Sequence, residues 1–419
     1  MRRAFLALPL VLLLTACGGA APAARPASLP AAQPAPSAPQ PGAQPAPPAG
    51  PDLLAQTAQH KLSPDEMQRG LLRYLNQGEG TPVARLDALF QKWGLKPSAS
   101  ARLYTEADLR GDGQTEVIAT LKSDNPTTGP GALFVIYKQD GHWAVDRTPR
   151  TDLPGVDLLT VAPLTGDNRQ VIVWSATGLA ANSPPTRYFF SVWQPGGITN
   201  LPGSGDPYMV YPRLAIEGKD VVLRGGLMGS AGSGVAQRAR IDVWRFTDGA
   251  FKLADRAFDP HPESYFRLED GIVAEQFGHA VDARSAYGDA TEPSRAVAPD
   301  AFFPPSQGDL TQLRQRLGQA VGSFARFRAG LLALDKGDKA GADAVLSGDS
   351  GPFAGLTGAL QRAGQRAAGC ASAEAWAQAN PDFLKALNSP FGFGKVTWKP
   401  EELCGPLPLP FLDGPNPPK

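Results

Sequence analysis

Between about Leu103 and Glu275, apolar and polar residues alternate with a period of two, the spacing expected of β-strands that bury one face. One plan recurs three times in this stretch: a turn with Gly and Asp, a strand, a loop rich in Gly, Pro or Ser, and a second strand that carries aromatic residues. The first strands are predicted at 116–121, 171–174 and 221–223, and the second strands at 134–137, 188–193 and 241–246. The fold must therefore accommodate successive hairpin units.

The second strands end in turns that favour antiparallel pairing. Asp140-Gly141 and Asp248-Gly249 are the strongest short-range hairpin signal, and Gly196-Gly197 stands at the same place in the second repeat. A fourth hairpin is predicted over 265–275, around Asp270-Gly271. The repeats recur about every 50 to 56 residues, close to the length of a propeller blade, but closed propellers contain about four to eight blades. We therefore expect a central antiparallel β domain of three to four hairpin repeats, as a curved sheet, a sandwich or a partial propeller.

Helical patterns flank this β region. Ser63, Pro64 and Glu66 form a capping signal for one helix, and a second helix is predicted over 81–94. Asp309 caps a later run of apolar residues at helical spacing. The fold class is therefore predicted as α+β, with helices on both sides of the β domain.

Proline and alanine dominate residues 18–51, which contain eleven prolines and one charged side chain, Arg25. Such a composition cannot bury a core, so it predicts an extended tether. The expected organisation is a signal peptide at 1–16, the tether with its cysteine at 17–51, a short helical segment at 52–100, the β-rich repeat domain at 101–300 and a helical region at 301–419.

The first residues indicate export. Arg2 and Arg3 precede an apolar run, 4–14, that is too short to span a bilayer as a helix. The run ends in Leu14-Thr15-Ala16-Cys17, which resembles the lipobox of bacterial lipoproteins. The resemblance implies that Cys17 is lipidated and becomes the N-terminus, so that acyl chains anchor the protein in the cell envelope, on the extracytoplasmic side. The alternative is an ordinary secretory signal in which Cys17 has no special role.

The other cysteines and the charge balance bear on compartment and partners. With Cys17 assigned to the lipid, Cys370 and Cys404 form an even pair in an oxidising compartment, and a disulfide between them is expected to staple the C-terminal tail. The sequence has 40 basic and 40 acidic residues, which leaves no excess positive charge for nucleic acid. The expected partners are the membrane, through the lipid anchor, and an envelope protein or glycan, with no nucleic acid.

One turn has the pattern of a cation site. In Asp108-Leu109-Arg110-Gly111-Asp112-Gly113-Gln114-Thr115-Glu116, acidic residues alternate around glycines. The segment resembles the Asp-rich turn of FG-GAP and related integrin-like repeats, some of which bind calcium, and the resemblance implies Asp108, Asp112 and Glu116 as oxygen ligands. Arg110 departs from the family pattern, which usually places Asp or Asn there. The alternative is a polar turn that opens a strand, in which case no cofactor is required.

Catalytic signals are incomplete. Gly348-Asp349-Ser350-Gly351-Pro352 approaches the sequence around a serine-protease nucleophile, but it lacks the second glycine, and no histidine stands in a matching context. We therefore predict no catalytic residue, and a non-enzymatic binding or assembly module as the function. The alternative is an envelope hydrolase that acts on glycans or lipids, which requires two carboxylates in one cleft.

Overall fold

The computed structural model describes residues 64–77, 85–86, 89, 104–121, 131–148, 155–167, 169–177, 185–210, 212–226, 238–295, 308–390 and 396–405. All of them belong to one compact unit that begins at Asp52. The predicted signal peptide, Cys17, the predicted tether and most of the helix predicted over 81–94 lie outside the described residues. None of the described helices combines the length and the apolar character needed to cross a membrane.

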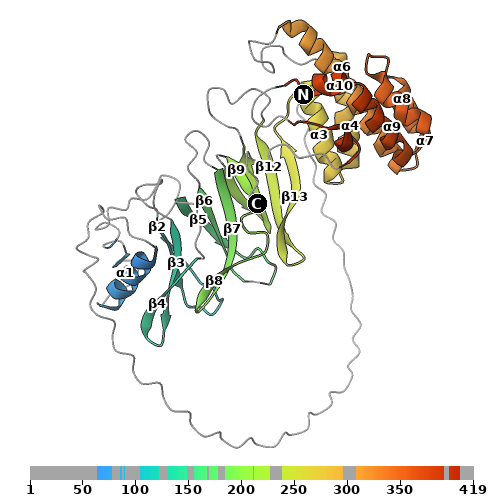
Figure 1. Ribbon diagram of the computed structural model, residues 1–419. Coiled ribbons are helices and arrows are strands. Elements are labelled where there is room, and N and C mark those ends of the chain that lie inside the picture. Colours follow the sequence, from blue (N-terminus) through green and yellow to red (C-terminus); the bar gives the residue numbers. More distant parts are fainter. Residues whose placement is uncertain are drawn as a thin grey trace, which may run out of the picture. The chain divides into compact units, whose positions relative to one another are not determined.

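Three antiparallel sheets follow one another along the chain (Figure 1). The first sheet has the order β1-β2-β3-β4, the third has β10-β11-β12-β13, and the second has β5-β6-β7-β8 with β9 paired to β7. The strands are β1 (Tyr104–Ala107), β2 (Glu116–Leu121), β3 (Ala132–Gln139), β4 (His142–Arg147), β5 (Gly155–Ala162), β6 (Val171–Thr177), β7 (Pro185–Gln194), β8 (Gly197–Asn200), β9 (Tyr208–Val210), β10 (Arg213–Glu217), β11 (Asp220–Gly225), β12 (Arg240–Thr247) and β13 (Ala250–Phe258).

The predicted α+β class is confirmed, and the sheets are open rather than closed into barrels. All six strands predicted from the repeats are present, as β2, β3, β6, β7, β11 and β12. Two of the predicted turns have the backbone of a type I′ hairpin, since φ is 50° and 82° at Asp140 and Gly141, and 52° and 80° at Asp248 and Gly249. Local turn chemistry therefore fixed the pairing of β3 with β4 and of β12 with β13.

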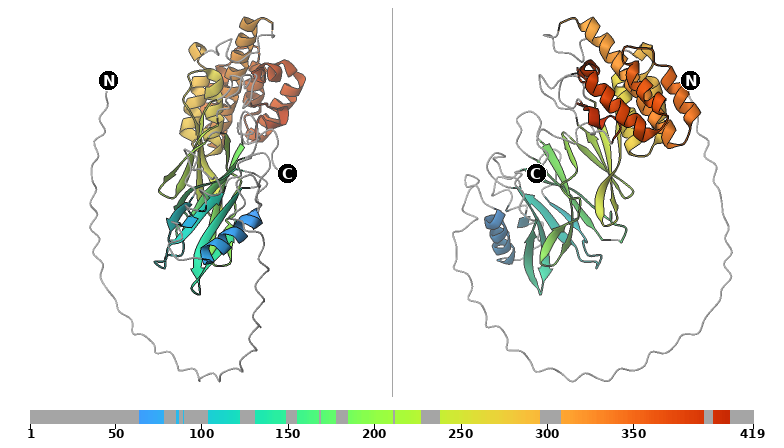
Figure 2. Two further views of the ribbon diagram at one scale, coloured as in Figure 1. Left: turned by 90° about the vertical axis from the view of Figure 1, so that its left-hand side faces the viewer. Right: turned by 45° about the vertical axis from the view of Figure 1, so that its right-hand side comes forward.

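Apolar clusters lie between neighbouring sheets. The sheets follow one another in both views of Figure 2. One cluster joins helix α1 (Pro64–Asn76) to one face of the first sheet. A second joins the opposite face of that sheet to the second sheet, where the rings of Tyr137 and Trp193 meet edge to face with centroids 4.8 Å apart. A third joins the second and third sheets, with Phe190 stacked on Phe251 at 3.8 Å. The recurring aromatic residues thus belong to the contacts between repeats.

The fourth hairpin predicted over 265–275 is wrong. Residues Ser264–Gln276 form helix α3, and α4 (Ala280–Ala290) follows. The structure therefore turns helical directly after β13, well before residue 300, where the β-rich domain was expected to end.

A glycine inside α3 explains the error. Asp270-Gly271 has the sequence of a hairpin turn, but Gly271 lies inside the helix. A glycine is required there because the ring of Tyr287, in α4, occupies the space where a side chain would begin. A Cβ at Gly271 would lie 2.5 Å from that ring. The glycine therefore serves close packing between two helices rather than a turn, and single-sequence turn rules cannot separate the two uses.

The remaining helices pack around α6 (Leu310–Asp335). Asp309 caps α6 as predicted, since its carboxylate accepts hydrogen bonds of 2.9 and 3.2 Å from the N–H groups of Thr311 and Gln312. The other elements of this region are the short 3₁₀ turn η1 (Pro293–Arg295), α7 (Lys339–Ser347), α8 (Ala354–Ala363), α9 (Arg366–Ala379), α10 (Pro381–Leu387) and the 3₁₀ turn η2 (Pro400–Glu402).

Candidate functional site

The predicted calcium turn joins β1 to β2. In this turn the Asp108 carboxylate is occupied by backbone N–H groups of the turn itself. The Asp108 carboxylate accepts hydrogen bonds from the N–H groups of Gly111 and Gly113, at 2.7 and 2.8 Å. These bonds, that of Gly113 most of all, lower the pKa of Asp108. Both glycines have positive φ, 71° and 81°, which lets the backbone wrap around the carboxylate.

The guanidinium of Arg110 pairs with the other two acids. Its Nη2 lies 3.0 Å from Asp112 Oδ2, and its Nε donates a hydrogen bond of 3.1 Å to Glu116 Oε1. Glu116 is buried and also accepts the N–H of Leu109 at 2.9 Å. Arg110 thus supplies the positive charge that a cation would bring. No three His, Cys, Asp or Glu of the described residues are grouped to hold a metal ion, and calcium at Asp108, Asp112 and Glu116 stays a prediction.

Cys370 and Cys404 form the expected disulfide, with Cα atoms 5.8 Å apart. The segment 396–405 is also held by buried contacts. Trp398 is 1% exposed, and Arg328 of α6 donates a hydrogen bond of 2.9 Å from Nη1 to the carbonyl oxygen of Leu403. The end of the described chain is therefore part of the helical core as well as covalently stapled to α9.

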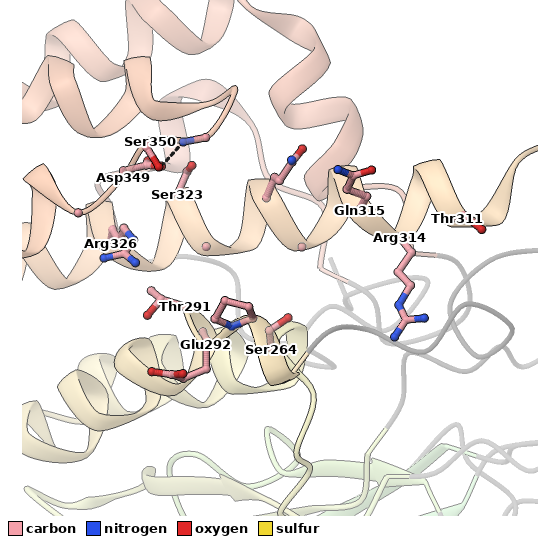
Figure 3. A pocket seen from close by; sticks show the side chains of 17 residues that line it. Ser264, Thr291, Glu292, Thr311, Arg314, Gln315, Ser323, Arg326, Asp349 and Ser350 are labelled. Carbon is pink, nitrogen blue, oxygen red and sulfur yellow. Dashed lines mark hydrogen bonds between the residues drawn. The ribbon is translucent and has the colours of Figure 1, made fainter.

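A cavity of about 640 Å³ opens in the helical region, between α6, the residues after α4 and the loop from α7 to α8 (Figure 3). This volume falls within the range of about 300–1,000 Å³ typical of small-molecule sites. A second cavity of about the same volume, 640 Å³, lies between β1 and β5, beside the turn described above. The cavity in the helical region is called the α6 cavity from here on. Its lining contains both basic and acidic side chains, whereas the charged residues that line the second cavity are all acidic.

One wall of the α6 cavity is a row of residues from α6, namely Arg314, Gly318, Gly322 and Arg326. Neighbours four residues apart adjoin on the helix surface, and because each step also advances about 40° around the axis, the row winds about 120° around α6 from Arg314 to Arg326. The two arginines stand at opposite ends of the row (Figure 3). Their Cα positions are about 18 Å apart along the helix axis, at a rise of roughly 1.5 Å per residue. Both are half-buried, and within the described part of the chain neither has a carboxylate at ion-pair distance.

The glycines of this row are not explained by close packing. A Cβ at Gly318 or Gly322 would meet no atom within 4 Å. By contrast, a Cβ at Gly330, further along α6, would lie 2.8 Å from Leu346 of α7. Packing against α7 therefore accounts for Gly330, whereas Gly318 and Gly322 border open space.

The opposite wall includes Ser264, the first residue of α3. Ser264 is 3% exposed, and its Oγ has no hydrogen-bond partner among the described residues. The residue before it, Glu263, provides no side-chain cap for the first turn of α3. A buried hydroxyl without a partner is unusual, because such a group loses its hydrogen bonds to water and gains none in return.

The loop 348–351 closes one end of the α6 cavity. Asp349 accepts hydrogen bonds from the Gly351 N–H at 3.2 Å and from the Thr357 hydroxyl at 3.1 Å, so its carboxylate shapes the loop. Ser350, the serine of the protease-like sequence, lines the cavity, but the described lining residues include no histidine to activate it. The lining offers hydrogen-bond donors and positive charge, which suits binding.

Sequence analysis did not predict this site, because its walls come from segments distant in the chain. One signal was nevertheless present in α6. This helix has 26 residues, and a glycine in a helix interior costs about 1 kcal/mol relative to alanine. Gly318 and Gly322, flanked by Arg314 and Arg326 at the same spacing, therefore mark a helix face that keeps space beside it.

Comparisons of the chain with protein-family models, with curated proteins and with solved structures found no match. Function is therefore inferred from the residues and their geometry.

Proposed function

We propose that this protein is a membrane-anchored lipoprotein of the cell envelope whose folded part is a non-enzymatic binding module. Lipidated Cys17, at the end of Leu14-Thr15-Ala16-Cys17, is the anchor. The disulfide between Cys370 and Cys404 supports an extracytoplasmic location such as the periplasm, because disulfides persist in oxidising compartments. The proline-rich composition of residues 18–51 predicts a spacer between membrane and module with a reach of at most roughly 100 Å, at about 3.1 Å per residue.

The binding role rests on the α6 cavity. Its volume suits a small molecule, and its lining holds two half-buried arginines without ion-pair partners in the described chain. A ligand from the envelope, free or attached to a glycan or protein partner, would meet those charges. Assembly with an envelope protein remains compatible with the same anchored architecture.

The hydrolase alternative needs two carboxylates poised in one cleft. Glu292 and Asp349 both line the α6 cavity, but Asp349 is engaged by its own loop through Gly351 and Thr357. We therefore place binding ahead of hydrolysis of glycans or lipids. Turnover of an envelope glycan or lipid that Glu292→Gln abolishes would reverse that order.

Calcium binding by Asp108, Asp112 and Glu116 is a separate proposal, supported by the alternation of acids and glycines in the turn. Arg110 competes with a cation for Asp112 and Glu116, so we expect calcium binding by the wild-type turn to be weak.

Cell fractionation tests the anchor. Wild-type protein is expected in the membrane fraction, and Cys17→Ser is expected in the soluble fraction because the acylated sulfur is lost. Cys404→Ser is the matched control, since it removes a different cysteine and should stay with the membrane. Membrane retention of Cys17→Ser would defeat the proposal.

Peptide mapping without reductant tests the oxidising compartment. We expect one linked pair of peptides that contains Cys370 and Cys404, and two free thiols would contradict the extracytoplasmic location.

A further inference from the structure

We infer that the α6 cavity binds a small organic anion, whose carboxylate or phosphate group pairs with Arg326. This inference rests on the proposed binding role and adds the chemistry of the ligand. It follows from four features of the cavity: a half-buried arginine without a carboxylate partner among the described residues, a buried hydroxyl without a partner among them, two helix positions without side chains, and a second arginine at the far end.

Arg326 lies beside the loop after α7 and has no carboxylate at ion-pair distance among the described residues. A Cβ added at Gly348 would lie only 2.7 Å from Nη1 of Arg326. The absence of a side chain at Gly348 therefore makes room for the guanidinium. The neighbouring carboxylate, Asp349, accepts hydrogen bonds within its own loop instead. A guanidinium presents a planar fork of N–H donors that matches a carboxylate or a phosphate, which is the partner that this one lacks.

Ser264 supplies an independent indication of a ligand. Its hydroxyl is buried at the cavity, has no partner among the described residues, and sits in the first turn of α3. The first turn of a helix favours negative charge, because its N–H groups point outward without partners within the helix. An oxygen atom of a bound anion would accept a hydrogen bond from this hydroxyl.

The row of glycines indicates where the body of the ligand lies. Gly318 and Gly322 expose the backbone and Cα atoms of α6, so they offer a smooth surface beside which an uncharged chain can lie. Arg314, at the other end of the row, can pair with a second negative group (Figure 3). The geometry therefore favours an elongated anion, and a dianion over a monoanion of the same length.

The acidic residues of the lining do not cancel this preference. Glu292 is exposed at the rim, where water screens its charge. Asp349 is engaged by the N–H of Gly351 and the hydroxyl of Thr357, which spread its negative charge over its own loop. The half-buried guanidiniums are thus the charges best placed to meet a ligand.

Binding can be measured on the purified full chain by calorimetric titration and by the ligand-induced rise in melting temperature. The probes are suberate, a dicarboxylate, octyl phosphate, and the uncharged diol with the carbon chain of suberate. We expect at least one anion to bind with a dissociation constant in the millimolar range or below and the diol to bind at least about tenfold more weakly. Whichever anion binds more tightly identifies the head group as carboxylate or phosphate.

Two variants place the binding in the cavity. Arg326→Gln removes the charge and should weaken anion binding about tenfold or more. Gly322→Leu fills the open space, and it should abolish binding without unfolding the helix, since a Cβ there meets no atom within 4 Å. Arg316→Gln is the matched control, because Arg316 is an exposed arginine of α6 outside the cavity lining, and it should bind like wild type.

Equal binding of suberate and the diol would overturn the role of charge. Unchanged anion binding in Gly322→Leu, or no binding of either anion at millimolar concentration, would overturn the site. These outcomes are distinguishable from failure of the proposed anchor, because fractionation of Cys17→Ser reports on the membrane attachment whether or not a ligand binds.

Discussion

The indole Nε1 of Trp193, in the second sheet, donates a hydrogen bond of 2.8 Å to Oδ2 of Asp146, in the first sheet. The same oxygen accepts the N–H of Gly196 at 3.0 Å. Trp244 holds the corresponding place in the third sheet and is equally buried, at 5% exposed, but its indole N–H has no partner among the described residues. Equivalent tryptophans of the repeats therefore differ in what holds them.

Trp193→Phe should destabilise the protein by about 1–3 kcal/mol more than Trp244→Phe. Both changes remove the same atoms from similarly buried sites, but only the first takes from a charged acceptor, Asp146, one of its two donors and leaves it with the N–H of Gly196. Urea unfolding of the two variants measures the difference. Equal losses of stability would show that the hydrogen bond between the sheets contributes nothing beyond packing.

Asp242→Asn should cost about 3–5 kcal/mol of stability. Asp242 is buried between two guanidiniums, with Arg256 donating at 2.5 and 2.7 Å and Arg240 at 3.1 Å. Arg240 also donates at 2.6 Å to the carbonyl oxygen of Tyr208 in the second sheet, so the cluster ties two sheets together. Removing the charge of Asp242 takes a carboxylate that both buried guanidiniums contact out of the cluster, which is costly at a buried site.

The matched control for this cluster is Asp220→Asn in the same sheet. Asp220 accepts two hydrogen bonds of 2.6 Å from Arg245, but the Arg245 side chain is 54% exposed. Water screens such a pair, so we expect a loss below about 1 kcal/mol. Thermal or urea unfolding of both variants checks the contrast, and similar losses would contradict the assigned importance of burial.

The free energy of unfolding should fall as the pH rises from about 4.5 to about 8, because Glu269 of α3 is protonated in the folded protein over this range. Burial raises the pKa of Glu269 to about 8 from its usual 4.5, although Arg238 lies 3.3 Å away, and Arg238 itself pairs with Asp270 at 2.6 Å. Between those values the folded protein keeps a proton that the unfolded chain has released, so each added pH unit costs at most about 1.4 kcal/mol.

The measurement is the urea midpoint across that pH window, for wild type and for Glu269→Gln. The variant cannot titrate at this position, so its stability should vary less with pH. A constant difference between the two proteins throughout the window would show that Glu269 does not hold a proton in the folded state.

The parts of the fold that sequence predicted correctly are those set by neighbouring residues. Asp140-Gly141 and Asp248-Gly249 adopt their turns through local backbone preferences, and Asp309 caps α6 through a contact two residues away. Gly271 misled the prediction, because the reason for it lies in Tyr287, sixteen residues further along the chain. Turn rules read only local sequence, so they cannot detect a glycine that serves packing.

The candidate sites show the same limit. The acids of the turn at Asp108 were found from their spacing, but the pairing of Arg110 with Glu116 became visible only in three dimensions. The α6 cavity brings Ser264 and Arg326 together from different helices, and no local pattern links positions so far apart. Local chemistry could be predicted from sequence, whereas the partner that completes or blocks it could not.

Arg110→Asn should strengthen calcium binding by the turn at Asp108. The change removes the guanidinium that pairs with Asp112 and Glu116, and it adds an oxygen donor at the position where FG-GAP turns usually carry Asp or Asn. We expect saturating calcium to stabilise the variant by about 1–3 kcal/mol and wild type by less than about 0.5 kcal/mol. Thermal unfolding with calcium and with a chelator measures both, and Asp112→Ala in the variant background should remove the effect. A calcium-dependent rise in the wild-type melting temperature that Asp112→Ala abolishes would instead show that Arg110 yields to the cation.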